Sequence, residues 1–156
     1  MATYLKHNIE VISGNLYYHG RNRQLSHEIK RGDMGAITLA AWEMAEWIED
    51  WSNVALVPIP SHRGKATYTL HLAKAIGKGE VFDILRCRER ETLYSRKHAG
   101  KRTTAFDLGF YAIGKVPADK RIVFVDNVVA TGTTAKAAVY AVGPGTVLSF
   151  SYAKIG

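Results

Sequence analysis

The stretch from residue 121 to residue 134, RIVFVDNVVATGTT, constrains the fold of this chain more than any other. Its first five residues are mainly β-branched and aromatic, which is typical of a strand covered on both faces in a parallel sheet. The polar pair Asp126 and Asn127 is expected to end this strand, and the alanine-rich residues 135–141 predict a helix packed closely against the sheet. The predicted order is therefore strand, acidic tip, small-residue loop and helix.

The loop in this stretch carries residue types that bind phosphate. The first turn of a helix leaves backbone N–H groups unpaired and carries a positive dipole, which favours an anion. The residues expected to hold a phosphate are Ala130, Thr131, Gly132, Thr133 and Thr134. Asp126, at the carboxyl end of the strand, would accept hydrogen bonds from ribose hydroxyls. Together these features describe a site for a ribose 5-phosphate, and the structural alternative is an ordinary N-cap and turn.

A second loop of similar character follows a second apolar run. Residues 54–58 predict another buried strand, and residues 66–76 predict the helix after it. The residues between them that are expected to bind an anion are Ser61, His62, Arg63, Gly64 and Lys65. Main-chain amides near Gly64 and the forked guanidinium of Arg63 are suited to phosphate. A solvated turn is the alternative, but two such loops fit a ligand with phosphate groups at both ends.

A strongly basic segment follows residues 81–85, which predict a third core strand. Between residues 86 and 102 there are seven cations and two glutamates, so this segment supplies five of the seven net positive charges of the chain. If a loop of this kind closed over a diphosphate, it would exclude water and bring Lys97, His98 and Arg102 to the charge on the leaving group. The alternative is a solvated run of charge.

The length of 156 residues and the hydrophobic content of 47% predict one domain over residues 1–156. The single Cys87 excludes a disulfide framework and a Cys-rich zinc module, and is expected to be buried. The sequence has no pattern of a signal peptide or a membrane span, so a cytoplasmic location is expected. Further predicted elements are a hairpin over 9–18 that turns at 13–15, a helix over 36–51 with core tryptophans, a β-segment over 105–113 and a strand over 147–153.

The stretch 121–134 resembles the 5-phosphoribosyl-1-diphosphate (PRPP) binding motif of type I phosphoribosyltransferases, which runs hydrophobic strand, two acids, short link and Thr-Gly-x-Thr. The N-terminal half, with YHGR at residues 18–21, a helix near 36–48 and VPIP at residues 57–60, is similar to the ComF group of competence-associated proteins. The resemblance spans nearly the whole chain. It departs from the family at Asn127, which replaces the second acid, and the Cys-rich zinc-binding region of many ComF proteins is absent from this sequence.

The resemblance implies a Rossmann-like α/β fold, with a parallel sheet flanked by helices and a small hood. The hood is expected mainly in residues 1–30 and the core in about 35–156. The strands at 54–57, 81–85 and 121–125 should be adjacent.

The resemblance also implies a reaction, in which the 5-phosphoribosyl group of Mg²⁺-bound PRPP is transferred to an unidentified nitrogenous acceptor with release of pyrophosphate. Asp126 and Asn127 would bind the ribose, residues 130–134 the 5-phosphate and residues 61–65 the pyrophosphate. Magnesium would contact Asp126 only through ribose or water. The residues with implied catalytic roles are Arg63, Lys97, His98 and Arg102.

Two other classes of function stay open at the level of sequence. One is a non-catalytic sensor of PRPP or a nucleotide, favoured by Asn127 and by Ala130, which stands where purine-salvage members carry an acid. The other is an accessory protein in DNA uptake that binds single-stranded nucleic acid, favoured by the net charge of +7. No membrane partner is expected, and a homodimer is compatible with the sequence.

Overall fold

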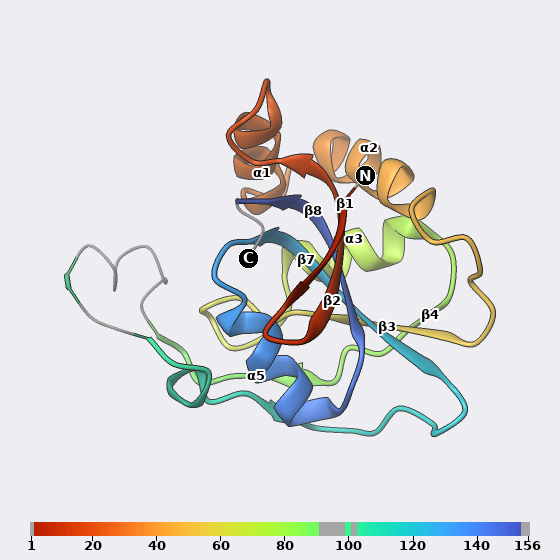
Figure 1. Cartoon of the computed structure of the whole chain (residues 1–156), viewed down its shortest axis with the longest axis vertical. Coiled ribbons are helices and arrows are strands. Elements are labelled where there is room, and N and C mark those ends of the chain that lie inside the picture. The colour runs from red at the N-terminus through yellow and green to blue at the C-terminus, as the bar shows by residue number, and fades with distance from the viewer. Residues whose placement is uncertain (1, 91–98, 101–102, 154–156) are drawn as a thin grey trace.

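The computed structural model describes residues 2–90, 99–100 and 103–153. Its central feature is a six-stranded sheet in the order β1-β2-β8-β7-β3-β4, in which every neighbouring pair except β1 and β2 is parallel (Figure 1). The strands are β1 (Ala2–Lys6), β2 (Ile9–Leu16), β3 (Val54–Pro58), β4 (Glu80–Val81), β7 (Arg121–Val129) and β8 (Thr146–Tyr152). The helices are α1 (Asn22–Lys30), α2 (Met34–Ala45), α3 (Tyr68–Ile76) and α5 (Thr133–Val142).

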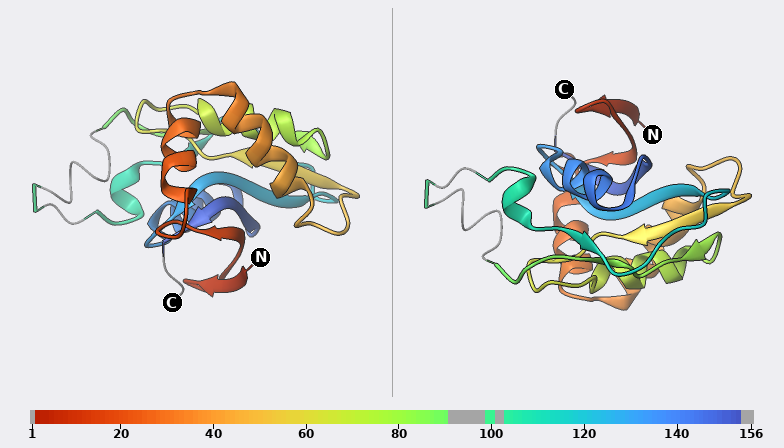
Figure 2. Two further views of the ribbon diagram at one scale, coloured as in Figure 1. Left: turned by 90° about the horizontal axis from the view of Figure 1, so that it is seen from above. Right: turned by 90° about the horizontal axis from the view of Figure 1, so that it is seen from below.

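Helices cover both faces of this sheet. Helices α1, α2 and α3 lie on one face and α5 lies on the other (Figure 2). Because side chains alternate along a strand, Val123 and Val125 of β7 enter the core under α1 to α3, whereas Phe124 enters the core under α5. Burial on both faces is the reason that β3 and β7 are continuous apolar runs, and the α/β class predicted from them is confirmed.

The direction of winding reverses between β3 and β7. From β3, the chain passes through α3 to β4 at one edge of the sheet, while from β7 it passes through α5 to β8 in the opposite direction. Right-handed crossovers in opposite directions place their helices on opposite faces. In open α/β sheets, ligands bind beyond the carboxyl ends of the strands at such a reversal point.

Strand β7 does not end at the polar pair, as the sequence predicted. It runs on to Val129, because β8 continues beside it and pairs Asp126 with Ser149 and Val129 with Tyr152. Strand β3 has no counterpart to this extension, since its last pairing joins Pro58 to Val125. Beyond that point β7 has a neighbour on one side only, which opens the sheet next to Asp126.

The N-terminal segment is built differently from the prediction. The hairpin turns at His7 and Asn8, both with positive φ, and not at residues 13–15. Gly14 lies inside β2, where a Cβ atom would overlap the Trp47 indole. Strands β1 and β2 extend the main sheet, so most of the segment expected to form a hood belongs to the sheet. Of the residues assigned to the hood, only α1 lies near the carboxyl edge, where the hood was expected.

Three other predicted elements are shorter than expected. Helix α2 ends at Ala45, and Trp42 on its outer side is 64% exposed, so not every tryptophan in this region is a core residue. The strand predicted at 81–85 is divided between β4 and β5 (Leu85–Arg86). Strand β5 pairs with β6 (Tyr111–Ala112) in a separate two-stranded sheet, and the β-segment predicted at 105–113 consists of a 3₁₀ turn (Phe106–Leu108) and β6.

The remaining predictions agree more closely with the structure. Helix α3 and strand β8 have nearly the predicted bounds, and β4, β3 and β7 are adjacent as expected. Cys87 is buried. Within the described ranges, no helix combines the length and apolarity that crossing a membrane requires.

Candidate functional site

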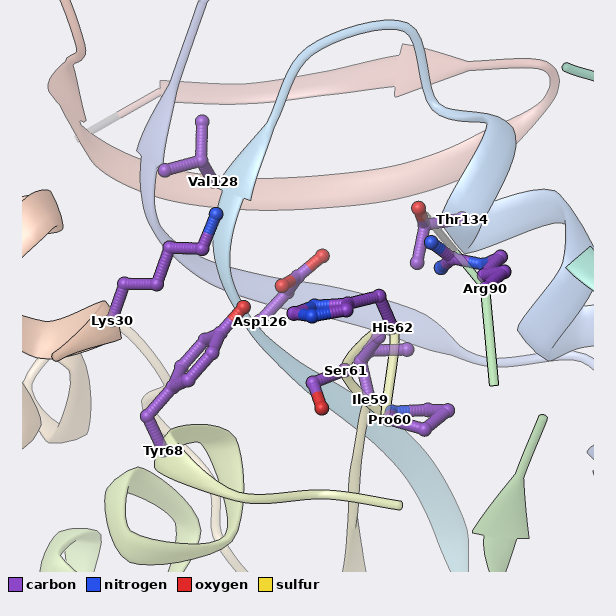
Figure 3. Close-up of a pocket in the computed structure, with 10 residues that line it drawn as sticks. All are labelled: Lys30, Ile59, Pro60, Ser61, His62, Tyr68, Arg90, Asp126, Val128 and Thr134. Atoms are coloured by element: carbon purple, nitrogen blue, oxygen red, sulfur yellow. The ribbon is translucent and has the colours of Figure 1, made fainter. Parts of the chain in front are cut away.

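A cavity of about 170 Å³ lies at the reversal point, beyond the carboxyl ends of β3 and β7. Its walls come from α1, the segment after β3, the start of α3, strand β7, the start of α5 and the segment after β5 (Figure 3). The lining residues are Lys30, Ile59, Pro60, Ser61, His62, Tyr68, Arg90, Asp126, Val128 and Thr134. Asp126 is the single carboxylate among these described residues, whereas Lys30 and Arg90 are cations.

Asp126 belongs to the part of β7 that has lost its β3 neighbour, so its side chain reaches the cavity. Its Oδ1 accepts a hydrogen bond of 2.8 Å from the backbone amide of Asn127. Burial raises the pKa of the carboxyl from its ordinary value of 3.8 to about 7, and the hydrogen bond from Asn127 partly opposes this rise. Burial, followed by the nearby Asp126 carboxylate, also raises the pKa of the Tyr68 hydroxyl. The site therefore holds a carboxyl that can change its protonation near neutral pH.

Asn127 does not join Asp126 in the cavity. Neighbouring residues of a strand point to opposite sides, and Asn127 is only 4% exposed beneath α1. Its Nδ2 donates a hydrogen bond of 2.8 Å to the carbonyl of Ser26, while no described residue donates to its Oδ1. Asn127 thus connects α1 to the sheet. Its side chain lies on the side of β7 opposite to Asp126, which disagrees with the prediction that both residues bind one ribose.

The loop from β7 to α5 has the form that the sequence indicated. Gly132 precedes the helix with φ +82, and the Thr131 and Thr133 hydroxyls lie 2.9 Å apart. The Thr133 amide donates only to Thr131 Oγ1, at a long 3.4 Å, and within the described chain the amides of Gly132, Thr134 and Ala135 have no protein acceptor. The helix N-terminus therefore keeps donors for a ligand. Of the five predicted residues, Thr134 lines the cavity.

The hairpin turn between β1 and β2 packs against this loop. His7 Nε2 donates a hydrogen bond of 2.9 Å to the Thr131 carbonyl. A Cβ atom on Gly132 would lie 2.5 Å from Lys6 Cγ and 2.9 Å from His7 Cδ2, so only glycine fits beneath the turn. The sequence analysis did not identify Lys6 and His7, because their place beside the loop depends on the pairing of β2 with β8.

The loop at residues 61–65 is a closed turn. Ser61 and Lys65 are joined by a backbone hydrogen bond of 3.0 Å, and the Gly64 amide donates to the Ser61 carbonyl. The Arg63 amide donates to Ser61 Oγ, and the Gly64 carbonyl accepts from the Cys87 amide. The amides of Ser61, Arg63 and Gly64 therefore already have protein partners and are not free for a ligand.

The side chains of this loop point to different places. Ser61 and His62 line the cavity, and both also line an adjoining groove, where Arg63 joins them. Gly64 and Lys65 are not among the lining residues of either hollow. The structure therefore brings Ser61, His62 and Arg63 together, while Gly64 shapes the turn with φ +103.

His62 lies among cations. Burial lowers the pKa of its imidazole below the ordinary 6.5, and the charges of Lys30, Arg63 and Arg90 lower it further, against a small opposing effect of Glu89. At neutral pH the uncharged form of this histidine predominates, and its ring can donate one hydrogen bond and accept another. The surrounding cations favour an anion in the cavity.

Several lining residues were missed by the sequence analysis, namely Lys30, Tyr68, Arg90 and Val128. Arg90 was counted in the basic segment, and its backbone amide is fixed by the His62 carbonyl at 2.9 Å. The catalytic candidates Lys97, His98 and Arg102 lie outside the described residues, so the structure does not test them.

A protein-held metal site is not apparent in the described residues, where no three His, Cys, Asp or Glu side chains gather to hold an ion. One carboxylate beside Lys30 and Arg90 does not fit a magnesium ion held by protein ligands alone. It does fit an ion that arrives on the oxygens of a polyphosphate and keeps several waters. Asp126 would then contact magnesium through water or through the ligand.

A search against models of known protein families found no match, and a search among curated proteins found no similar sequence.

Proposed function

We propose that this protein binds magnesium-bound PRPP and transfers its 5-phosphoribosyl group to a nitrogen nucleophile, as the resemblance to type I phosphoribosyltransferases implies. One observation carries the proposal: Asp126 lies in a cationic cavity at the winding reversal, beside a helix N-terminus where the amides of Gly132, Thr134 and Ala135 have no described protein acceptor. A carboxylate for a diol and free amides for a phosphate match the two ends of a ribose 5-phosphate.

The same geometry supports an orientation for PRPP. The 5-phosphate would lie at the N-terminus of α5, near Thr134, and the ribose hydroxyls would donate to Asp126. The pyrophosphate would extend toward Ser61, His62 and Arg63, where Lys30 and Arg90 add positive charge. In this orientation C1 of the ribose lies between the carboxylate and the cations.

In the proposed reaction, the bond from C1 to pyrophosphate breaks through an oxocarbenium-like state and the nitrogen nucleophile adds to C1. Positioning and electrostatic stabilisation of the leaving group supply most of the rate increase. Lys30, Arg63 and Arg90 are suited to stabilise charge on pyrophosphate, and the roles of Lys97, His98 and Arg102 stay predictions. Magnesium that arrives with the ligand would neutralise part of the same charge.

Isothermal titration calorimetry with magnesium and PRPP tests the proposal. Asp126→Ala should weaken binding by at least about 1.5 kcal/mol, the lower end for a hydrogen bond to a charged group. Asp119→Ala is the matched control, because Asp119 is an exposed acid that lines neither hollow, and its affinity should equal that of wild type. Absence of PRPP binding to the wild-type protein would refute the proposal.

A PRPP or nucleotide sensor without catalysis is the second candidate. It is favoured by the burial of Asn127, because only Asp126 then faces the ribose. The type I phosphoribosyltransferases, which this stretch resembles, have two acids there. PRPP binding without pyrophosphate release, in the presence of any nitrogen nucleophile, would support the sensor over the transferase.

Single-stranded nucleic acid is a third candidate ligand. Arg21, Arg23 and Arg31 surround an open hollow of about 470 Å³ at α1, and Tyr18 nearby in the chain is 72% exposed. Cations with an exposed aromatic ring are the usual elements of such sites. Oligonucleotide binding that falls steeply with salt and is unaffected by Asp126→Ala would favour this function.

A further inference from the structure

A groove of about 580 Å³ adjoins the cavity, within the size range of small-molecule sites. It shares Lys30, Ser61, His62 and Tyr68 with the cavity. A molecule bound in the groove would therefore lie against whatever occupies the cavity. If PRPP takes the cavity, the groove is the nearest place for its reaction partner.

The groove has two walls of different origin. One wall is the loop with Ser61, His62 and Arg63, which the proposed function assigns to pyrophosphate. The other is the C-terminal part of α1, with His27, Lys30 and Arg31, of which only Lys30 has a role in the proposed binding of PRPP. Arg31 lines the groove and not the cavity, so its charge is available to a molecule bound in the groove.

The charge of the groove is of one sign. Among the described residues that line it there is no carboxylate, while Lys30, Arg31 and Arg63 are fixed cations. No ion pair described in the structure involves these three residues. The interaction of Lys30 and Arg31 with the negative end of the α1 dipole accounts for cations at this helix end. The helix dipole does not explain why a groove of about 580 Å³ separates Lys30 and Arg31 from Arg63.

We propose that the groove binds the acceptor of the transfer, and that this acceptor is a planar nitrogen heterocycle carrying a carboxylate. The carboxylate pairs with the Arg31 guanidinium, which can donate two parallel hydrogen bonds, and with Lys30. The ring lies beside Tyr68 and His62. This inference rests on the proposed function, whose site it extends.

The atoms balance in a simple way. The lone pair of the ring nitrogen forms the bond to C1, and the bond from C1 to pyrophosphate breaks with its electron pair leaving on the pyrophosphate oxygen. Where that nitrogen carries a proton, as in orotate, the proton passes to the departing pyrophosphate; a pyridine nitrogen, as in nicotinate, has none and becomes a pyridinium cation. No oxidant or reductant is needed.

Matched probe pairs test the charge of the acceptor. Orotate and uracil differ by a carboxylate, and nicotinate differs from nicotinamide by the same charge. With wild-type protein, magnesium and PRPP, at least one carboxylated probe should bind in calorimetry and release pyrophosphate. Its kcat/KM should exceed that of its neutral partner at least about tenfold, as expected for a charge-assisted hydrogen bond. Equal or better use of the neutral partners would overturn the inference.

Arg31→Ala tests the residue. Its KM for the carboxylated probe should rise about tenfold with kcat little changed, and its affinity for magnesium and PRPP alone should stay within about twofold of wild type. Arg31→Lys should recover part of the loss, because charge returns without the paired hydrogen bonds. Lys74→Ala is the control, since Lys74 is also a cation in the last turn of a helix but lines neither hollow.

The outcomes separate this inference from the function on which it rests. If PRPP does not bind, both fail. If PRPP binds and no carboxylated probe does, the acceptor inference fails and the PRPP site stands. If Arg31→Ala weakens PRPP binding as strongly as it weakens the acceptor, the groove belongs to pyrophosphate and the inference is overturned.

Discussion

The Asp126 carboxyl lies in a cavity where burial raises its pKa to about 7. An acid whose pKa is higher in the folded chain than in the unfolded chain takes up a proton on folding at pH values between the two. Its contribution to stability is therefore greatest at low pH and is lost as the pH rises from 3.8 to about 7. Above this range the ionised carboxylate destabilises the fold, and hydrogen bonds donated by the hydroxyls of a ligand would reduce that cost.

Asp126→Asn should remove this dependence. The variant should match wild type near the lower end of that pH range and exceed it above the upper end by roughly 2–4 kcal/mol, because an amide has no charge to bury. Urea unfolding at several pH values measures the difference, and Asp119→Asn, at an exposed site, should show none of it. A difference in stability that does not change with pH would contradict the assignment of a buried, titrating carboxyl.

Asn127 gives a second prediction at this scale. Asn127→Asp restores the second acid of the resembling motif, but its oxygen would face the Ser26 carbonyl in place of the present donor. The folded state should lose about 3 kcal/mol at alkaline pH, where a charge is buried, and less at acidic pH, where a protonated carboxyl can donate.

The control for this substitution is Asn22→Asp. The Asn22 amide also donates to a backbone carbonyl, that of Leu16, but in an exposed place at the first turn of α1. A negative charge is favourable there, so the change in stability should be within about 1 kcal/mol. If Asn127→Asp changes the stability as little as Asn22→Asp does, burial is not the reason that an asparagine is required at position 127.

At the scale of elements, the turn of the N-terminal hairpin and the loop before α5 fit together through Gly132. Gly132→Ala should destabilise the fold and weaken the binding of magnesium and PRPP, because the new Cβ meets Lys6 and His7 in addition to the strain of a positive φ. Gly32→Ala has the same type of strain, at φ +83, with nothing within 4 Å of the new Cβ.

The difference between these two variants isolates the contact. We expect Gly132→Ala to lose at least about 1 kcal/mol more than Gly32→Ala in urea unfolding, and only Gly132→Ala to reduce PRPP affinity. Equal losses for both variants, with PRPP affinity retained, would show that the hairpin does not shape the loop.

The elements that sequence reasoning found are those with a strong local pattern. Strands β3 and β7 were found because burial on both faces requires an unbroken apolar run, and α5 was found because close packing on the sheet favours alanine. The turn of the hairpin was predicted at the wrong place for two reasons. His7 and Asn8 adopt positive φ although neither is a glycine. Gly14 was interpreted as a turn residue, but it lies within a strand and leaves room for the Trp47 indole. The end of β7 was misplaced because its length depends on β8, far along the chain.

The sequence predicted one segment of the site, but not which residues of other segments join it in the cavity. Asp126 and the loop before α5 follow directly from a strand and a helix in sequence. Lys30, Tyr68 and Arg90 enter the cavity from three other parts of the chain. Nothing in the local sequence marks Lys30 or Tyr68, and Arg90 is one of seven cations in a basic segment. The position of Asn127 on the opposite side follows from strand alternation, but only once β7 is known to continue through it.

For the whole molecule, ligand binding and global stability are linked, because an unfolded chain has no assembled cavity. Magnesium with PRPP at a hundredfold excess over the dissociation constant should stabilise the fold by about 2.7 kcal/mol, a rise of about 5–10 °C in melting temperature. Removal of magnesium by EDTA should abolish most of this rise, and Asp126→Ala should abolish it as well. The same rise with EDTA present would argue against a metal carried by the ligand.

Strand β2, near the start of the chain, is hydrogen-bonded to β8, near its end. During synthesis on the ribosome, the hairpin of β1 and β2 cannot take its place in the sheet until β8 has emerged. The turn that supports Gly132 is then set only at the last stage of folding, as expected for contacts between distant parts of a sequence. A product that ends before β8 would consequently lack the support for this turn and bind the sugar phosphate poorly.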